Sequence, residues 1–125
     1  MKNPTLHQAA LILLSATLLC GCSPKGVSYK REVEPILKQN CHACHLPGGD
    51  GQTKSGLDMS SYNNLMKGTK FGPIIKPGDS LSSVLIMLVE GRADPSIRMP
   101  HDGKRMEGKD IQTLKSWVEQ GAKNN

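Results

Sequence analysis

The sequence predicts an all-α fold of about four helices joined by long loops. Apolar residues recur at helical spacing in several stretches, and no stretch shows the alternation that is typical of a β-strand. The 125 residues include 13 glycines and 8 prolines, and only 3% of them are aromatic. So few large apolar side chains make a thin core for a chain of this size. Either part of the chain is disordered, or something besides protein fills the interior.

Residues 1–21 are predicted to be an export signal of the lipoprotein type. Lys2 precedes the uncharged apolar run 9–19, which is shorter than the roughly 20 residues that cross a bilayer but suits a secretory signal. Small residues before Cys22 resemble the bacterial lipoprotein cleavage box. We therefore expect Cys22 to carry a lipid at the periplasmic face of a bacterial membrane, with Cys20 lost along with the signal. An ordinary signal peptide is the alternative, and it would also export the protein.

The mature chain is predicted to consist of an anchor and linker, residues 22–28, and a single domain, residues 29–125. Ser28 is the expected N-cap of a first helix that runs through Gln39. Pro35 lies inside this helix and lacks an N–H group, so we expect a kink there. The apolar residues of the helix keep helical spacing: Tyr29, Val33, Ile36 and Leu37.

Loops and short helices are expected in the middle of the domain. The Gly-rich stretch 46–56 is predicted to be a loop. A short helix follows, capped by Ser60 or Ser61 and ended by Gly68. Residues 71–79 contain two prolines and two glycines, so they should be extended or turning.

Two further helices are expected in the second half of the domain. Ser80 should cap a helix that ends at Gly91, and residues 91–106 should form a second long loop. The last helix is expected from about Lys109 to Gln120. Tyr62 and Phe71 are expected in the core, and Trp117 either in helix packing or on the wall of a cofactor pocket.

Cys41, Cys44 and His45 form the C-x-x-C-H pattern of covalent c-type haem attachment. Two thiols must add to two vinyl groups on one edge of a porphyrin. On a helical turn Cys44 lies about 300° round from Cys41 and His45 about 40°, so both sulfurs and the imidazole share one face. His45 is therefore expected to bind the haem iron, whereas His42, about 100° away, should point elsewhere. A haem would supply the apolar interior that the composition lacks.

Three other interpretations of this motif are weaker. A disulfide or a thioredoxin-like redox pair needs a βαβ context, which the sequence lacks. A zinc site needs four ligands, and Cys41, Cys44, His45 and His101 would have to supply them. A chance match is the third. Export favours haem attachment, because that reaction occurs outside the cytoplasm.

Met99 is the predicted second axial ligand of the haem iron. The following Pro100 biases Met99 toward an extended backbone, which can project its thioether inward from loop 91–106. A thioether is a standard axial partner of c-type haem iron and raises its potential. His101 in the same loop is the alternative ligand. A haem without a sixth ligand would open the way to peroxidase chemistry or gas sensing.

Six short words, in this order along the chain, resemble the planctomycete-type cytochrome c domain, which is class I-like and carries one haem: VEPIL, CHACH, GLDMSSY, GPIIKPGD, RMP and WVEQGA. The resemblance implies an all-α fold wrapped round one haem c, with His/Met ligation and electron transfer. It also suggests that a backbone carbonyl at Gly72 or Pro73 accepts the ring N–H of His45. At Glu107 the resemblance leads us to expect Ser or Thr capping the last helix, and Glu is a poorer cap.

The sequence therefore predicts an exported, lipid-anchored electron carrier with one haem c per chain and no catalytic residue. The alternatives are an electron-accepting, haem-bearing subunit of a membrane-associated dehydrogenase complex and a haem peroxidase. The net charge of +5 includes no run of five like charges, so no nucleic-acid partner is expected. We expect redox partner proteins at or near the membrane. Acidic surfaces on these partners would face the basic residues of the loops, which are equally well explained as solvated loop charges: Lys67, Lys70, Lys76, Arg98, Lys104 and Arg105.

Overall fold

The computed structural model describes residues 26–125, and the predicted signal 1–21 and Cys22 lie outside them. The described residues form six α-helices and no β-strand, which confirms the all-α class. None of these helices is long and apolar enough to span a membrane. The helices are α1 (Glu34–Asn40), α2 (His42–His45), α3 (Asp50–Ser55), α4 (Tyr62–Lys67), α5 (Val84–Glu90) and α6 (Gly108–Glu119). A π-helical turn, Tyr29–Val33, precedes α1, and a 3₁₀ turn, Pro95–Ile97, lies in the loop after α5.

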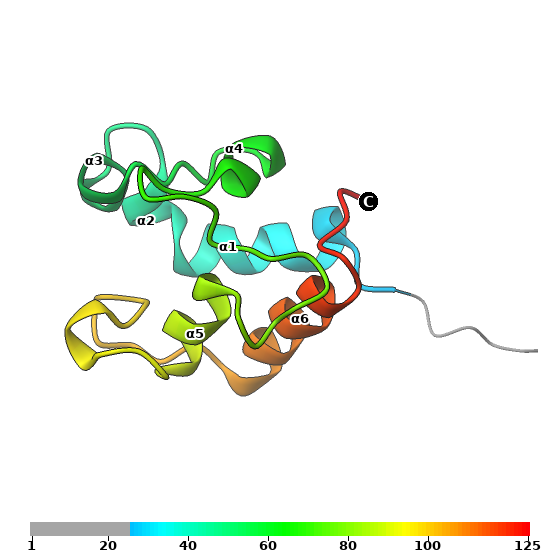
Figure 1. Cartoon of the computed structure of the whole chain (residues 1–125). Helices are drawn as coiled ribbons and strands as arrows, with labels where there is room; N and C mark the ends of the chain where they lie inside the picture. Colours follow the sequence, from blue (N-terminus) through cyan, green and yellow to red (C-terminus); the bar gives the residue numbers. More distant parts are fainter. Residues whose placement is uncertain (1–25) are drawn as a thin grey trace, which may run out of the picture.

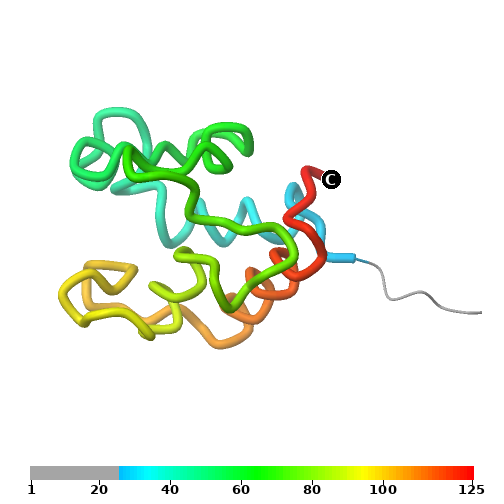
Figure 2. Tube along the Cα trace, in the orientation of Figure 1, coloured from blue at the N-terminus to red at the C-terminus, as the bar shows by residue number. Residues whose placement is uncertain are grey.

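The helices form two arms that meet at α1 and α6 (Figures 1 and 2). One arm contains α2, α3 and α4, and the other contains α5 and the loop that follows it. On the opposite side the two described ends of the chain are tied together. The Ser28 hydroxyl donates to the carbonyl of Asn125 at 2.8 Å, and the Val27 N–H donates to the Gln120 side chain at 2.7 Å. The first described residues therefore lie beside the end of α6, away from the opening between the arms.

The first helix begins at Ser28, as predicted, because its hydroxyl accepts a hydrogen bond from the Arg31 N–H. The irregularity expected at Pro35 takes the form of a π-helical turn just before the proline. There the carbonyl of Tyr29 accepts the N–H of Glu34, five residues on. The wider turn makes room for the proline ring, which in a regular α-helix clashes with the carbonyl four residues earlier.

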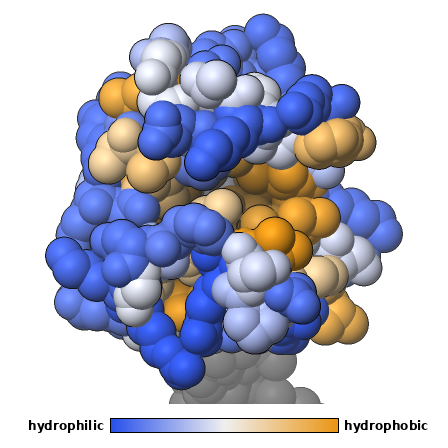
Figure 3. All heavy atoms as spheres, turned by 90° about the vertical axis from the view of Figure 1, so that its left-hand side faces the viewer, coloured by the Kyte–Doolittle hydropathy of each residue, from blue (hydrophilic) through white to orange (hydrophobic). Residues whose placement is uncertain are grey.

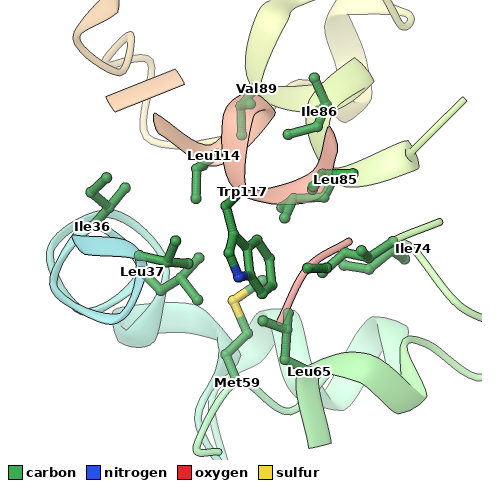
Figure 4. Close-up of a cluster of buried hydrophobic side chains, with 14 of the residues drawn as sticks. Ile36, Leu37, Met59, Leu65, Ile74, Leu85, Ile86, Val89, Leu114 and Trp117 are labelled. Carbon is green, nitrogen blue, oxygen red and sulfur yellow. The ribbon is translucent and has the colours of Figure 1, made fainter. Parts of the chain in front are cut away.

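Trp117 lies at the centre of the core (Figure 4). Its ring centroid is 5.6 Å from that of Tyr29 and 6.4 Å from that of Tyr62, and its indole N–H donates to the carbonyl of Lys123. Helix α6 thereby packs on the first helix and on α4. The helices contribute further fully buried apolar side chains: Leu37, Leu65, Ile86, Leu114 and Val118. Helix α6 begins at Gly108, and the side chain of Glu107 makes no capping hydrogen bond.

The N-cap of α5 is Ser83, so the prediction that Ser80 caps this helix is wrong. Ser80 donates instead to the carboxylate of Glu119 at 2.7 Å. Ser83 is almost fully buried, accepts the Lys76 N–H and donates to the carbonyl of Asp79. These bonds hold the turn 76–79 against the start of α5. The helix therefore begins at Val84, three residues later than a cap at Ser80 would place it.

Two other predictions from the sequence are wrong. The stretch 46–56 was expected to be a loop, but it contains α3, which ends at Gly56 with a φ of 78°. Helix α3 forms despite its glycine because it packs on α2, as described below. Phe71 was expected in the core, but its side chain is 84% exposed. It lies in the tight turn between Thr69 and Gly72, which carries it away from the core.

Replacing Ser83 with Ala should lower the free energy of unfolding by roughly 1–3 kcal/mol, because the Lys76 N–H and the Asp79 carbonyl lose their partner. Unfolding in urea measures this loss. Ser82→Ala is the matched control, since the Ser82 side chain is exposed and should cost about 0.5 kcal/mol or less. Equal effects of the two substitutions would contradict the role given to Ser83.

Candidate cofactor site

A cavity of about 910 Å³ opens between the two arms. One wall comes from α2, α3 and the segment 69–74, and the other from α5 and the loop 96–106. Figure 3 shows this face, where apolar side chains lie in a hollow surrounded by hydrophilic ones. The volume is at the upper end of the roughly 300–1,000 Å³ that is usual for ligand and cofactor sites. Trp117 does not line the cavity, so of its two expected roles the structure supports helix packing.

The helical turn formed by Cys41 and α2 places the three motif residues on the wall of this cavity. In this turn the N–H groups of Cys44 and His45 donate to the carbonyl of Cys41 at 3.1 and 3.0 Å. Cys41, Cys44 and His45 line the cavity, and His42 is absent from its walls. This is the separation of faces that the spacing predicts.

The environment of His45 favours a neutral imidazole. The residue is 7% exposed, and its Nδ1 is buried without a partner in hydrogen-bond geometry. Burial disfavours the imidazolium and lowers the pKa of His45, while the backbone of Leu57 acts on the ring in the opposite direction. Neutral imidazole is the form that binds metals, so the site favours a ligand role for His45.

The backbone near His45 belongs to the segment after α3. The N–H of Met59 donates to the His45 carbonyl at 2.8 Å, and Leu57 provides the backbone group that influences the ring. The resemblance suggested that a backbone carbonyl at Gly72 or Pro73 accepts the ring N–H of His45, and Pro73 also lines the cavity. The role of Leu57 was not foreseen, because no spacing rule links it to a histidine twelve residues earlier.

Two glycines allow α3 to pack directly on the motif turn. A Cβ at Gly49 would lie 2.5 Å from the carbonyl oxygen of Cys44. A Cβ at Gly51 would lie 2.8 Å from Cε1 of His45 and 2.9 Å from Nε2. Because real Cβ atoms do not approach so closely, only glycine fits at these two positions. The Gly-rich sequence after the motif is therefore a requirement of the site and not merely a flexible linker.

The chemistry of the two cysteines argues against a dithiol redox centre. Both are free thiols, and Cys41 is half-buried while Cys44 is exposed. Burial and the neighbouring Cys44 raise the pKa of Cys41 to about 12, whereas a redox-active cysteine needs a lowered pKa. The geometry does not support a zinc site either. Between residues 26 and 125, no three His, Cys, Asp or Glu side chains lie close enough together to form a metal-binding cluster.

Met99 lies on the cavity wall opposite α2, where it is half-buried. Its N–H donates to the carbonyl of Leu88 at 3.4 Å, which links the loop to α5. His101, the alternative ligand, also lines the cavity, but it is exposed and its Nδ1 lies 3.2 Å from the carbonyl of Arg98. Met59 and Met106 line the cavity too and are buried. The structure thus brings the predicted ligand and its rivals to one cavity.

Residues 41–103 match the family model described as Planctomycete cytochrome C. The match begins at Cys41 and includes His45 and Met99, so it spans both walls of the cavity. No curated protein and no solved structure matches the chain.

Replacing Gly51 with Ala should displace the ring of His45 or helix α3, because the new Cβ would lie 2.8 Å from the ring. Overpacking of this kind costs roughly 1–3 kcal/mol of the free energy of unfolding. Urea unfolding and the NMR shifts of the His45 ring protons measure the two effects. Gly108→Ala is the control, since nothing lies within 4 Å of its Cβ position. A Gly51 variant as stable as the control, with unshifted ring protons, would contradict the close packing.

Proposed function

The chain belongs to the planctomycete cytochrome c family, and we propose that it transfers single electrons through one c-type haem attached to Cys41 and Cys44. One observation carries the proposal. Cys41, Cys44 and His45 lie on a single helical turn at the wall of a large cavity lined mainly by apolar side chains. Two thiols and an imidazole on one face are the donor set that covalent haem attachment requires.

The residues of the cavity fit a haem in three ways. Cys41 and Cys44 would form thioether bonds, and the buried neutral His45 would bind the iron from one side. Met99 would bind it from the other side with its thioether. When bound, the haem supplies an iron that takes up and releases one electron. The apolar walls exclude water from it, and together with a thioether ligand they favour a higher reduction potential.

We propose that Cys22 carries a lipid that holds the protein at the periplasmic face of a bacterial membrane. The proposal rests on the apolar run 9–19 and on the small residues before Cys22. Ser28 lies six positions after Cys22, and six extended residues span roughly 20 Å. Because so short a tether keeps the protein close to the membrane, its partners would be redox proteins at or near the membrane. The basic loop residues favour acidic surfaces on these partners.

Haem attachment is tested by extraction with acid and acetone. The denatured protein should keep its haem, because thioether bonds survive this treatment. The double variant Cys41→Ala, Cys44→Ala should lose it, and His42→Ala should keep it as the control. Haem that is extracted from the unsubstituted protein would refute covalent attachment.

Met99→Ala should abolish the near-infrared absorption band of a sulfur–iron bond and lower the reduction potential. Met99→His should restore six-coordination at a potential still below that of the unsubstituted protein. Met87→Ala is the matched control, because Met87 is half-buried on α5 and does not line the cavity. A band that persists in Met99→Ala would assign the bond to another cavity methionine, such as Met59 or Met106.

Cys22→Ser should move the protein from the membrane fraction to the soluble periplasmic fraction, with its haem intact. The signal still directs export of this variant, and only the acceptor of the lipid is removed. Fractionation followed by haem staining measures the change. If the variant stays with the membranes, Cys22 is not the anchor.

A further inference from the structure

We propose that Phe71, at the mouth of the cavity, is the anchor of a docking surface for a redox protein with an acidic face. A docked protein can exchange electrons only if the cavity holds a haem, so this proposal rests on the proposed function. It adds the contact point, its apolar character and the direction of approach.

The exposure of Phe71 is unusual for this chain. Phe71 is the chain's single phenylalanine, and its side chain is 84% exposed, while Tyr29 and Trp117 are buried. A protein with few aromatic residues thus leaves a large ring in water beside its main cavity. Exposed aromatic rings of this kind supply much of the binding energy at the centres of protein interfaces.

The turn that carries Phe71 is fixed before any partner arrives. The N–H groups of Thr69 and Gly72 each donate to the other's carbonyl, at 2.9 and 3.0 Å. The N–H of Phe71 donates to the hydroxyl of Thr69, and the N–H of Lys70 donates to the carbonyl of Ser55 at the end of α3. A partner that binds here orders no loop, so little conformational entropy is lost on docking.

The surroundings of Phe71 combine apolar and basic groups. Val84 and Ile97 line the same cavity and are 40% and 51% exposed, so they too lie at its mouth. The ammonium of Lys70 stands 5.2 Å from the centroid of the Phe71 ring. Lys54 and Lys104 also line the cavity, as do Asp50 and Asp102.

The balance of charge at the mouth is positive. Within residues 26–125, none of the three lysines Lys54, Lys70 and Lys104 has an ion-pair partner. They outnumber the two aspartates there, so a carboxylate-bearing surface complements the mouth. The expected partner therefore has an apolar group that contacts Phe71 and carboxylates on either side that pair with these lysines.

The docking surface would stay accessible in the membrane-anchored protein. No residue before Gln39 or after Met106 lines the cavity, and Val27 is bound to Gln120 at the end of α6. A lipid on Cys22 would therefore hold the side of the molecule that carries the end of α6 toward the membrane (Figure 1). The partner would approach from the aqueous side.

A single phenylalanine makes the proposal directly testable by fluorine NMR. The full chain, loaded with haem and labelled with fluorophenylalanine, gives one resonance, which reports Phe71 alone. A blue-copper protein with an acidic surface serves as the probe. The resonance should shift or broaden as this probe is added, and Lys70→Gln should weaken binding about threefold. A resonance that does not change with an excess of the probe would overturn the proposal.

Stopped-flow kinetics separates docking from electron transfer itself. Phe71→Ser should lower the rate constant with the blue-copper protein about fivefold or more, and leave the rate with a small cobalt complex unchanged. Leu81→Ser is the matched control, because Leu81 is 72% exposed but does not line the cavity. Equal rates for the two variants with the blue-copper protein would overturn the proposal. If the unsubstituted protein reacts with neither reagent, the proposed function fails, while the fluorine titration still decides whether Phe71 docks the probe.

Discussion

The close packing of α3 against the turn Cys41–His45 is the constraint on which the rest of the site depends. Gly49 and Gly51 bring the backbone of α3 so near that a Cβ at either position would overlap Cys44 or the His45 ring. The imidazole is thereby held in a narrow space and buried, which lowers its pKa and favours its neutral form. If His45 binds the haem iron as proposed, a side chain fixed in this way would need little reorganisation when the iron changes its charge.

The core and the cavity are largely separate parts of the molecule. Trp117 and its aromatic neighbours Tyr29 and Tyr62 join the first helix, α4 and α6 without lining the cavity. Six buried residues belong to the core cluster and also line the cavity: Leu57, Met59, Ile74, Leu85, Val89 and Met106. The thin core is thus concentrated at the closed side of the fold, where α1 and α6 join the two arms. The chain has too few large apolar side chains to fill the open side between the arms, which leaves room for a cofactor.

The arrangement would also separate the proposed lipid attachment from the proposed exchange of electrons with partners. The first described residues and the end of α6 are tied together on the closed side, while the exposed Phe71 lies at the mouth. The proposed tether on one side and an accessible edge on the other would suit a protein that is held in place while partners dock and leave. Salt would weaken such docking, because the lysines at the mouth act through water.

The sequence by itself determined the helical class, the turn with Cys41, Cys44 and His45 on one face, and the helix start at Ser28. It narrowed the start of α4 to Ser60 or Ser61, and the structure has Ser61. These follow from local rules, since a cap and a helical period need only neighbouring residues. Only the tertiary structure decided that α3 forms, that α5 begins after Ser83, that Leu57 lies near His45 and that Phe71 faces solvent. Each depends on contacts between distant segments: the glycine packing on α2, the bonds of Ser83 to residues 76–79, and the turn held by Ser55. The pattern of residues within one segment cannot specify contacts with a distant segment, because folding alone brings the two together.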